Sequence, residues 1–150
     1  MNKLFEKPHL LFFISVPIIL LIGFFYRDSA IDFNIHDTYF VISDLHLSSL
    51  ISIIYGIIGI GYWVHLKTNR KLIKSFVVLH IILTIGGTIT FFGISFIPVN
   101  TFMDSDSSYF DAISRQDFIL SMLVLLIFLA QGLYLVNLII DIYKENKNKG

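Results

Sequence analysis

Five ionisable side chains fall within one short segment of the chain, which reads Asp32-Phe-Asn-Ile-His-Asp-Thr-Tyr-Phe-Val-Ile-Ser-Asp-Leu-His46. They are Asp32, His36, Asp37, Asp44 and His46. Imidazole and carboxylate groups can bind metal ions, ligate haem iron or transfer protons. Because the second half of the segment is otherwise apolar enough to enter a membrane, a carboxylate there costs about 2.5–3.5 kcal/mol. Ionisable groups in such a place indicate a functional site.

The elements that position these residues are predicted to be membrane helices. Of the 150 residues, 55% are hydrophobic and only 15% are charged, and the mean hydropathy is +0.77. A helix needs about 17–25 apolar residues to cross a hydrocarbon core of about 30 Å. Four stretches meet this requirement, at residues 10–26, 39–66, 74–97 and 118–142. We therefore expect one membrane domain over residues 1–150, an all-α integral membrane bundle of four transmembrane helices.

Composition also excludes several classes of protein and of binding site. The apolar runs are continuous, whereas the strands of a membrane β-barrel alternate apolar and polar residues. The chain has no cysteine, which excludes disulfides, thiolate metal sites and iron–sulfur clusters. A net charge of zero provides no basic surface for nucleic acid.

The distribution of charge predicts the orientation of the bundle. Lysine and arginine precede the first span, surround the turn between the second and third spans, and follow the fourth. The other two connections, residues 27–37 and 98–117, are acidic on balance. Since basic loops remain in the cytoplasm, we expect both termini to be cytoplasmic, in a bacterial inner membrane. The alternative for the first span is a signal peptide cleaved near Asp28-Ser-Ala30.

Two histidines are predicted to lie inside the membrane. Thr38 is a candidate N-cap for the second span, which places His46 about 12 Å along that helix at 1.5 Å per residue. His46 is then a candidate axial ligand for haem, or a histidine hydrogen-bonded to Ser or Thr on a neighbouring helix. His80 lies in the third span at a depth that differs by about 15–20 Å, so one haem cannot bridge the two within a monomer.

The segment resembles the signature His-Asp-Thr-Tyr-Tyr-Val-Val-Ala-His-Phe-His of subunit I of the haem–copper oxidases, such as cytochrome c oxidase. It reads His36-Asp-Thr-Tyr-Phe-Val-Ile-Ser-Asp-Leu-His46 here. The flanking Ile31-Asp-Phe-Asn-Ile35, and Leu79-His-Ile81, Gly87 and Thr90-Phe-Phe92 further along, are also similar to that family. The resemblance covers nearly the whole chain but only the last four of the twelve helices of that subunit. It implies the architecture of the C-terminal third of subunit I.

The resemblance also implies roles for individual residues. His46 matches the ligand of the low-spin haem, whereas Asp44 replaces the histidine that binds the high-spin haem. His36 and Asp37 match residues that bind a structural Mg²⁺, and Asp32 matches a carboxylate near the haem propionates. The copper-binding histidines lie on helices that have no counterpart here. No copper and no complete oxidase are therefore expected, while haem and Mg²⁺ are candidate cofactors.

Three functions remain open from the sequence. The first is an accessory subunit, related to oxidase subunit I, that associates with a respiratory complex. The second is a small haem-binding electron carrier that uses His46, in a dimer if both axial ligands are histidines. The third is a proton- or ion-handling protein that uses Asp44, with His80 as a further intramembrane residue of unassigned role. The expected partners are the lipid bilayer and other membrane subunits or a second copy.

Overall fold

Four helices long and apolar enough to cross a membrane make up most of the structure, a computed structural model that describes residues 7–35, 38–68, 72–97 and 106–149. The third of these helices consists of α3, a π-helix (η2) and α4 in continuous succession. The elements in chain order are α1 (Pro8–Phe25), β1 (Ala30–Ile35), β2 (Thr38–Ser43), α2 (Asp44–Lys67), α3 (Lys74–Ile81), η2 (Ile82–Gly86), α4 (Gly87–Ser95) and α5 (Asp106–Lys149). This set of long apolar helices indicates a multi-pass membrane protein.

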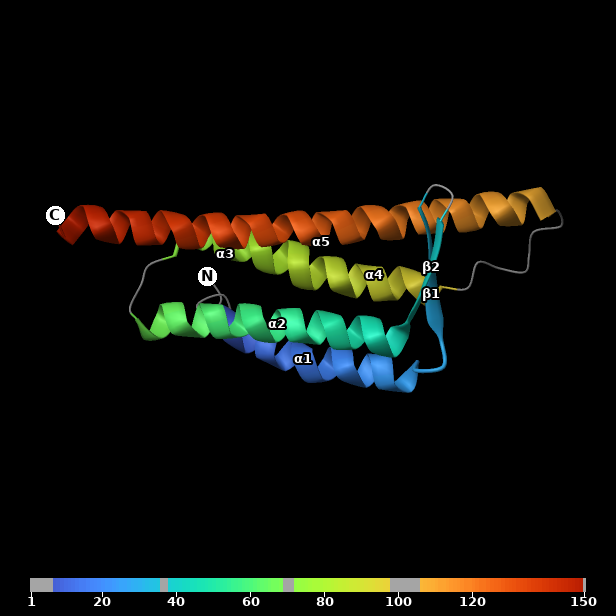
Figure 1. Ribbon diagram of the computed structural model, residues 1–150, viewed down its shortest axis with the longest axis horizontal. Helices are drawn as coiled ribbons and strands as arrows, with labels where there is room; N and C mark the ends of the chain where they lie inside the picture. Colours follow the sequence, from blue (N-terminus) through green and yellow to red (C-terminus); the bar gives the residue numbers. More distant parts are fainter. Residues whose placement is uncertain (1–6, 36–37, 69–71, 98–105, 150) are drawn as a thin grey trace.

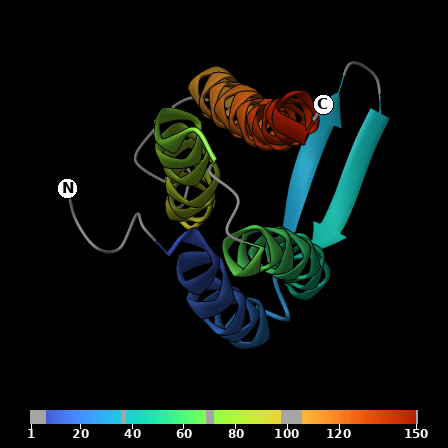
Figure 2. The ribbon, with the colours of Figure 1, turned by 90° about the vertical axis from the view of Figure 1, so that its left-hand side faces the viewer.

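The helices form two antiparallel pairs (Figures 1 and 2). One pair is α1 with α2, and the other is the α3–η2–α4 helix with α5. The two strands lie at one end of the bundle, which we call the hairpin end. The start of α1 and the end of α5 lie toward the opposite end, which we call the termini end.

The two pairs meet around Phe12, which is fully buried. Its ring packs edge-on against Tyr55 of α2 at 5.3 Å and stacks with Tyr62 at 5.7 Å. It also stacks with His80 of α3 at 5.5 Å. Aromatic rings of α1, α2 and α3 thus hold the pairs together at a single level, and the polar site described below lies at that level.

The β-hairpin corrects one sequence-based expectation. β1 and β2 pair antiparallel, from Ala30 opposite Ser43 to Ile35 opposite Thr38. Thr38 therefore begins a strand and does not cap a helix, and α2 begins only at Asp44. The physical reason is that residues 38–43 are mostly β-branched or aromatic, which favours an extended chain once a partner strand is available. The expected four-helix bundle is present, with the hairpin added at its end.

Candidate functional site

His80 lies in the interior of the bundle, in the second turn of α3, and has no exposed surface. Its Nδ1 is 2.9 Å from the Tyr62 hydroxyl of α2, and its Nε2 is 3.2 Å from Oε1 of Gln131 in α5. Because Oε1 can only accept a hydrogen bond, Nε2 carries the proton and Nδ1 accepts the Tyr62 hydroxyl. Both ring nitrogens are therefore engaged, by two different helices.

Hydrogen bonds continue from Gln131 toward the hairpin end. The Gln131 amide nitrogen donates to Thr84 Oγ1 at 3.2 Å and to the Ile127 carbonyl at 2.9 Å. The Thr84 carbonyl accepts the hydroxyls of Tyr55 and Thr88, both at 2.9 Å. The Tyr55 and Thr88 hydroxyls are also 2.7 Å apart. The network thus joins α2, the third span and α5.

The carbonyl that both hydroxyls approach belongs to the π-helix. Thr84 lies within η2, where the regular pattern of α-helical hydrogen bonds is interrupted. Single-turn π-helical segments often occur at functional sites. Here the segment presents a backbone acceptor to the interior of the bundle, directly after His80.

Aromatic rings surround the His80 imidazole. Phe12 and Tyr134 both stack on it, at centroid distances of 5.5 and 5.4 Å. The Tyr134 hydroxyl in turn lies against Gly61, at a place where any larger side chain would collide with it. The ring is consequently held in a fixed orientation within apolar surroundings.

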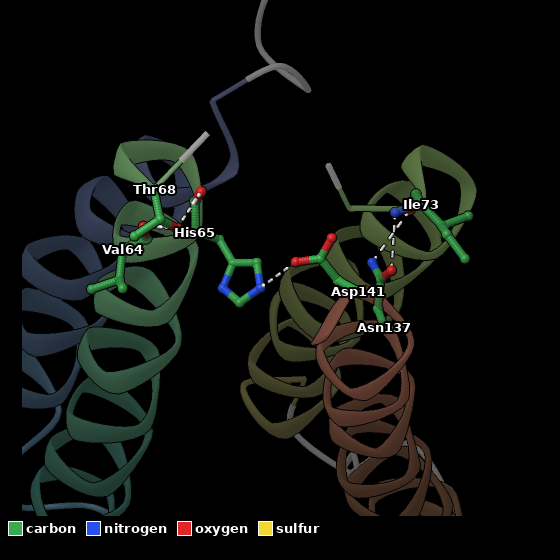
Figure 3. Close-up of polar contacts among 6 residues, drawn as sticks. All are labelled: Val64, His65, Thr68, Ile73, Asn137 and Asp141. Carbon is green, nitrogen blue, oxygen red and sulfur yellow. Dashed lines mark hydrogen bonds and ion pairs between the residues drawn. The ribbon is translucent and has the colours of Figure 1, made fainter. Parts of the chain in front are cut away.

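A second group of polar side chains lies at the termini end (Figure 3). His65 Nε2 of α2 is 3.2 Å from Asp141 Oδ2 of α5, in an ion pair that lacks the geometry of a directed hydrogen bond. Both side chains are close to nine-tenths buried. One turn earlier in α5, the Asn137 amide accepts the Ile73 backbone N–H at 2.9 Å and donates to the Ile73 carbonyl at 3.3 Å. These contacts tie α5 to the end of α2 and to the start of α3.

A third group lies at the hairpin end, where three polar residues recur every four positions on the face of α2 that packs on α1. Asp44 is 2% exposed and Ser48 is fully buried, and neither Asp44 Oδ1 nor Ser48 Oγ has a hydrogen-bond partner. Ser52 Oγ donates to the Val16 carbonyl of α1 at 3.4 Å. Asp44 is thus the first residue of α2, where the helix N-terminus favours a carboxylate. It is not the deeply inserted group that a helix beginning at Thr38 would make it.

The structure does not bring the predicted haem ligands together. His46 lies in the first turn of α2 with an exposed side chain, not about 12 Å along the helix as predicted. Tyr62, the partner of His80, is sixteen residues further along α2, or about 24 Å at 1.5 Å per residue. His46 therefore lies at the hairpin end, well separated from His80 along the bundle, as their predicted difference in depth implies.

The predicted magnesium ligands His36 and Asp37 lie outside the described residues. Asp32 belongs to β1, but its side chain also lies outside what the structure describes. Among the described residues no group of three His, Cys, Asp or Glu side chains is close enough to hold a metal ion. The magnesium site and the Asp32 propionate contact stay predictions.

Sequence reasoning singled out His80 and Asp44 but missed their surroundings. Gln131, Asn137 and Asp141 interrupt the apolar run of the fourth span, which is a signal for functional or packing roles in a membrane helix. No family model, curated protein or solved structure matches this chain. The chemistry of its own residues is thus what bears on its function.

Proposed function

We propose that this protein handles protons within the membrane, through buried polar side chains centred on His80. The observation that supports the proposal is an imidazole buried between the helices, with a hydroxyl donor on one nitrogen and an amide acceptor on the other. Imidazole is the side chain best suited to gain and lose a proton near neutral pH. Ionisable residues at such depth mark proton relays in many membrane proteins.

The hydrogen bond between Tyr62 and His80 can reverse its direction. In the present arrangement the Tyr62 hydroxyl donates to Nδ1. When the Tyr62 hydroxyl passes its proton to Nδ1 and its oxygen takes up another proton from a neighbouring water molecule, Nδ1 becomes the donor and the Tyr62 oxygen becomes the acceptor. The hydroxyl proton of Tyr62 is then free to point elsewhere, while Gln131 keeps the opposite nitrogen in place. The pair can therefore pass a proton without a large movement of either ring.

Buried polar side chains extend from this centre toward both ends of α2. Asp44, Ser48 and Ser52 precede Tyr55, and His65 with Asp141 follows Tyr62. From Asp44 to His65 the distance is about 32 Å at 1.5 Å per residue, close to the thickness of the hydrocarbon core. We expect water to bridge the one-turn steps from Asp44 through Ser48 to Ser52, from Ser52 to Tyr55 and from Tyr62 to His65. The hairpin end would face the outside of a bacterial inner membrane, with both termini in the cytoplasm.

Proton flux into liposomes tests this function. The purified protein is reconstituted into vesicles that contain a pH-sensitive dye, and valinomycin with a potassium gradient sets the membrane potential. We expect the unaltered protein to raise the flux above that of empty vesicles. His80→Phe should return it to the level of empty vesicles, and Asp44→Asn should lower it. Thr90→Val removes an exposed hydroxyl of the same span that bonds only its own helix, so it is the matched control and should leave flux unchanged.

Two results would contradict the proposal. One is a flux that never exceeds that of empty vesicles, which would make the network purely structural. The other is an unchanged flux in a folded His80→Phe protein. Should that variant fail to fold, Tyr62→Phe removes one hydroxyl only and is expected to lower the flux as well.

An accessory role beside a respiratory complex is a second candidate, and the open surface of α5 favours it. Only 11% of the apolar stretch in this helix is buried within the chain. Phe128 and Leu129 are 73% and 61% exposed. Such a surface fits either lipid or the helices of other subunits. The resemblance to oxidase subunit I would make a respiratory complex the partner.

Haem binding at His46 is the third candidate, and the exposed side chain leaves it accessible to a second copy or to a partner. Purification from the native membrane in mild detergent separates the candidates. Co-purifying respiratory subunits without visible absorption would support the accessory role. A reduced-minus-oxidised haem spectrum that His46→Ala abolishes would support the carrier. A colourless protein that purifies alone would contradict both.

A further inference from the structure

A pocket of about 330 Å³ lies between α1 and the third span, on the hairpin side of Phe12. Its inner wall is formed by the buried side chains of Ile19, Tyr55 and Thr88. Its rim is formed by Ile18 and Ile89, which are 52% and 68% exposed. The pocket therefore opens sideways from the bundle, toward the place that bilayer hydrocarbon occupies around a membrane-spanning helix.

Each polar side chain that lines the pocket is already hydrogen-bonded within the protein. Ser15 Oγ donates to the Leu11 carbonyl at 2.8 Å. The hydroxyls of Tyr55 and Thr88 bond to each other and to the Thr84 carbonyl. The rest of the lining is apolar apart from the backbone of Gly93. A ligand that fits this lining needs no polar group in contact with it.

Aromatic side chains close the pocket at the hairpin end. Tyr26, which follows α1, stacks on Phe96, which follows α4, at a centroid distance of 4.2 Å. Phe96 also stacks on Phe92, and both line the pocket. The Tyr26–Phe96 contact connects the two helix pairs on the hairpin side of the pocket, and Phe12 connects them on the side toward the termini end. The space between is large enough for a ligand, since ligand pockets begin at about 300 Å³.

We propose that this pocket binds one acyl chain of a membrane lipid, inserted between α1 and α4. The bilayer supplies such chains directly at the exposed rim, and an acyl chain leaves no polar group unsatisfied against this lining. An empty apolar space would lose the dispersion contacts of its walls. The acyl chain would also fill the space between the two helix pairs, between the stacked rings at either end of the pocket.

Photocrosslinking locates the lipid. The protein is reconstituted in vesicles of phosphatidylethanolamine and phosphatidylglycerol that contain a phosphatidylcholine with a diazirine on one acyl chain. After irradiation, mass spectrometry maps the labelled peptides. We expect labelling around Ile89 and Phe92 to exceed labelling around Phe128, on the open surface of α5, several-fold.

Gly93 provides the variant that blocks the pocket. Gly93 lines the pocket and a Cβ built on it meets no atom within 4 Å, so Gly93→Leu adds a bulky side chain there without a collision at its Cβ. We expect it to reduce pocket labelling to the level of the α5 surface. Gly132→Leu is the matched control, because Gly132 also has no atom within 4 Å of its Cβ position but lies on α5, away from the pocket.

Three outcomes would overturn the proposal. The first is equal labelling of the pocket and of the α5 surface in the unaltered protein, a comparison that requires no variant. The second is pocket labelling that Gly93→Leu leaves unchanged. The third is loss of pocket labelling when an isoprenoid quinone is added to the vesicles, which would assign the site to that class of ligand.

Discussion

Single side chains decide how closely α1 and α2 approach each other at the hairpin end. Gly23 of α1 lies directly against Ser48 of α2, and its Cβ position is also 3.2 Å from the Asp44 carbonyl. Small residues permit such close approach of membrane helices, which associate mainly through van der Waals packing. The same close approach of α1 to α2 buries the Asp44 side chain. The burial of this carboxylate therefore depends on the small size of Gly23.

Gly23→Ala should weaken this helix pair. The new methyl group would collide with Ser48 Cβ and lie 2.6 Å from its Oγ. Overpacking of this kind costs about 1–3 kcal/mol, more than the roughly 0.5–1 kcal/mol that alanine gains over glycine within a helix. We expect a lower midpoint of unfolding in detergent, followed by circular dichroism.

Gly56→Ala is the control for that measurement. No atom lies within 4 Å of the Cβ position of Gly56 on the same pair of helices, so only the gain in helix propensity applies. Adding Ser48→Gly to Gly23→Ala should restore most of the lost stability. If Gly23→Ala proved as stable as Gly56→Ala, the close packing of α1 against α2 at Gly23 would be contradicted.

At the scale of elements, the helices could be predicted from the sequence and the hairpin could not. The hydrocarbon core requires long apolar helices, and this requirement located all four spans. Most of the predicted ends lie within a few residues of the observed ones. Residues 39–43 are predicted as the start of a helix because a short apolar run next to a span fits either structure. The alternation of Ile31, Phe33 and Ile35 in the preceding segment was the available signal for a strand pair.

Individual residues of the site could be predicted from the sequence, but the contacts between them could not. His80 and Asp44 stand out as ionisable groups in apolar surroundings. Their partners depend on how three helices face one another, and neither Tyr62 nor Gln131 carries a local signal of that arrangement. The π-helix at Ile82–Gly86 likewise has no distinct sequence period, although it supplies the carbonyl that accepts two hydroxyls.

At the scale of the whole molecule, the two ends of the bundle differ in shape and charge. α5 is 44 residues long, or about 66 Å at 1.5 Å per residue, and extends beyond the other helices at both ends (Figure 1). Near the hairpin end, the charge of Arg27 is offset by Asp28, 3.7 Å away. At the termini end, Lys67 lies over the Trp63 ring at 4.8 Å, and both residue types are common at membrane boundaries.

This asymmetry predicts which end faces the cytoplasm, and the absence of native cysteine makes the prediction easy to test. Ser29→Cys places a thiol at the exposed hairpin end, and Thr68→Cys places one just after α2. In spheroplasts of a bacterial host, a membrane-impermeant maleimide should label Ser29→Cys directly and Thr68→Cys only after permeabilisation. The reverse pattern would contradict the orientation. Labelling of both thiols in intact spheroplasts would mean that α2 does not cross the membrane, and a proton path along α2 would then be excluded.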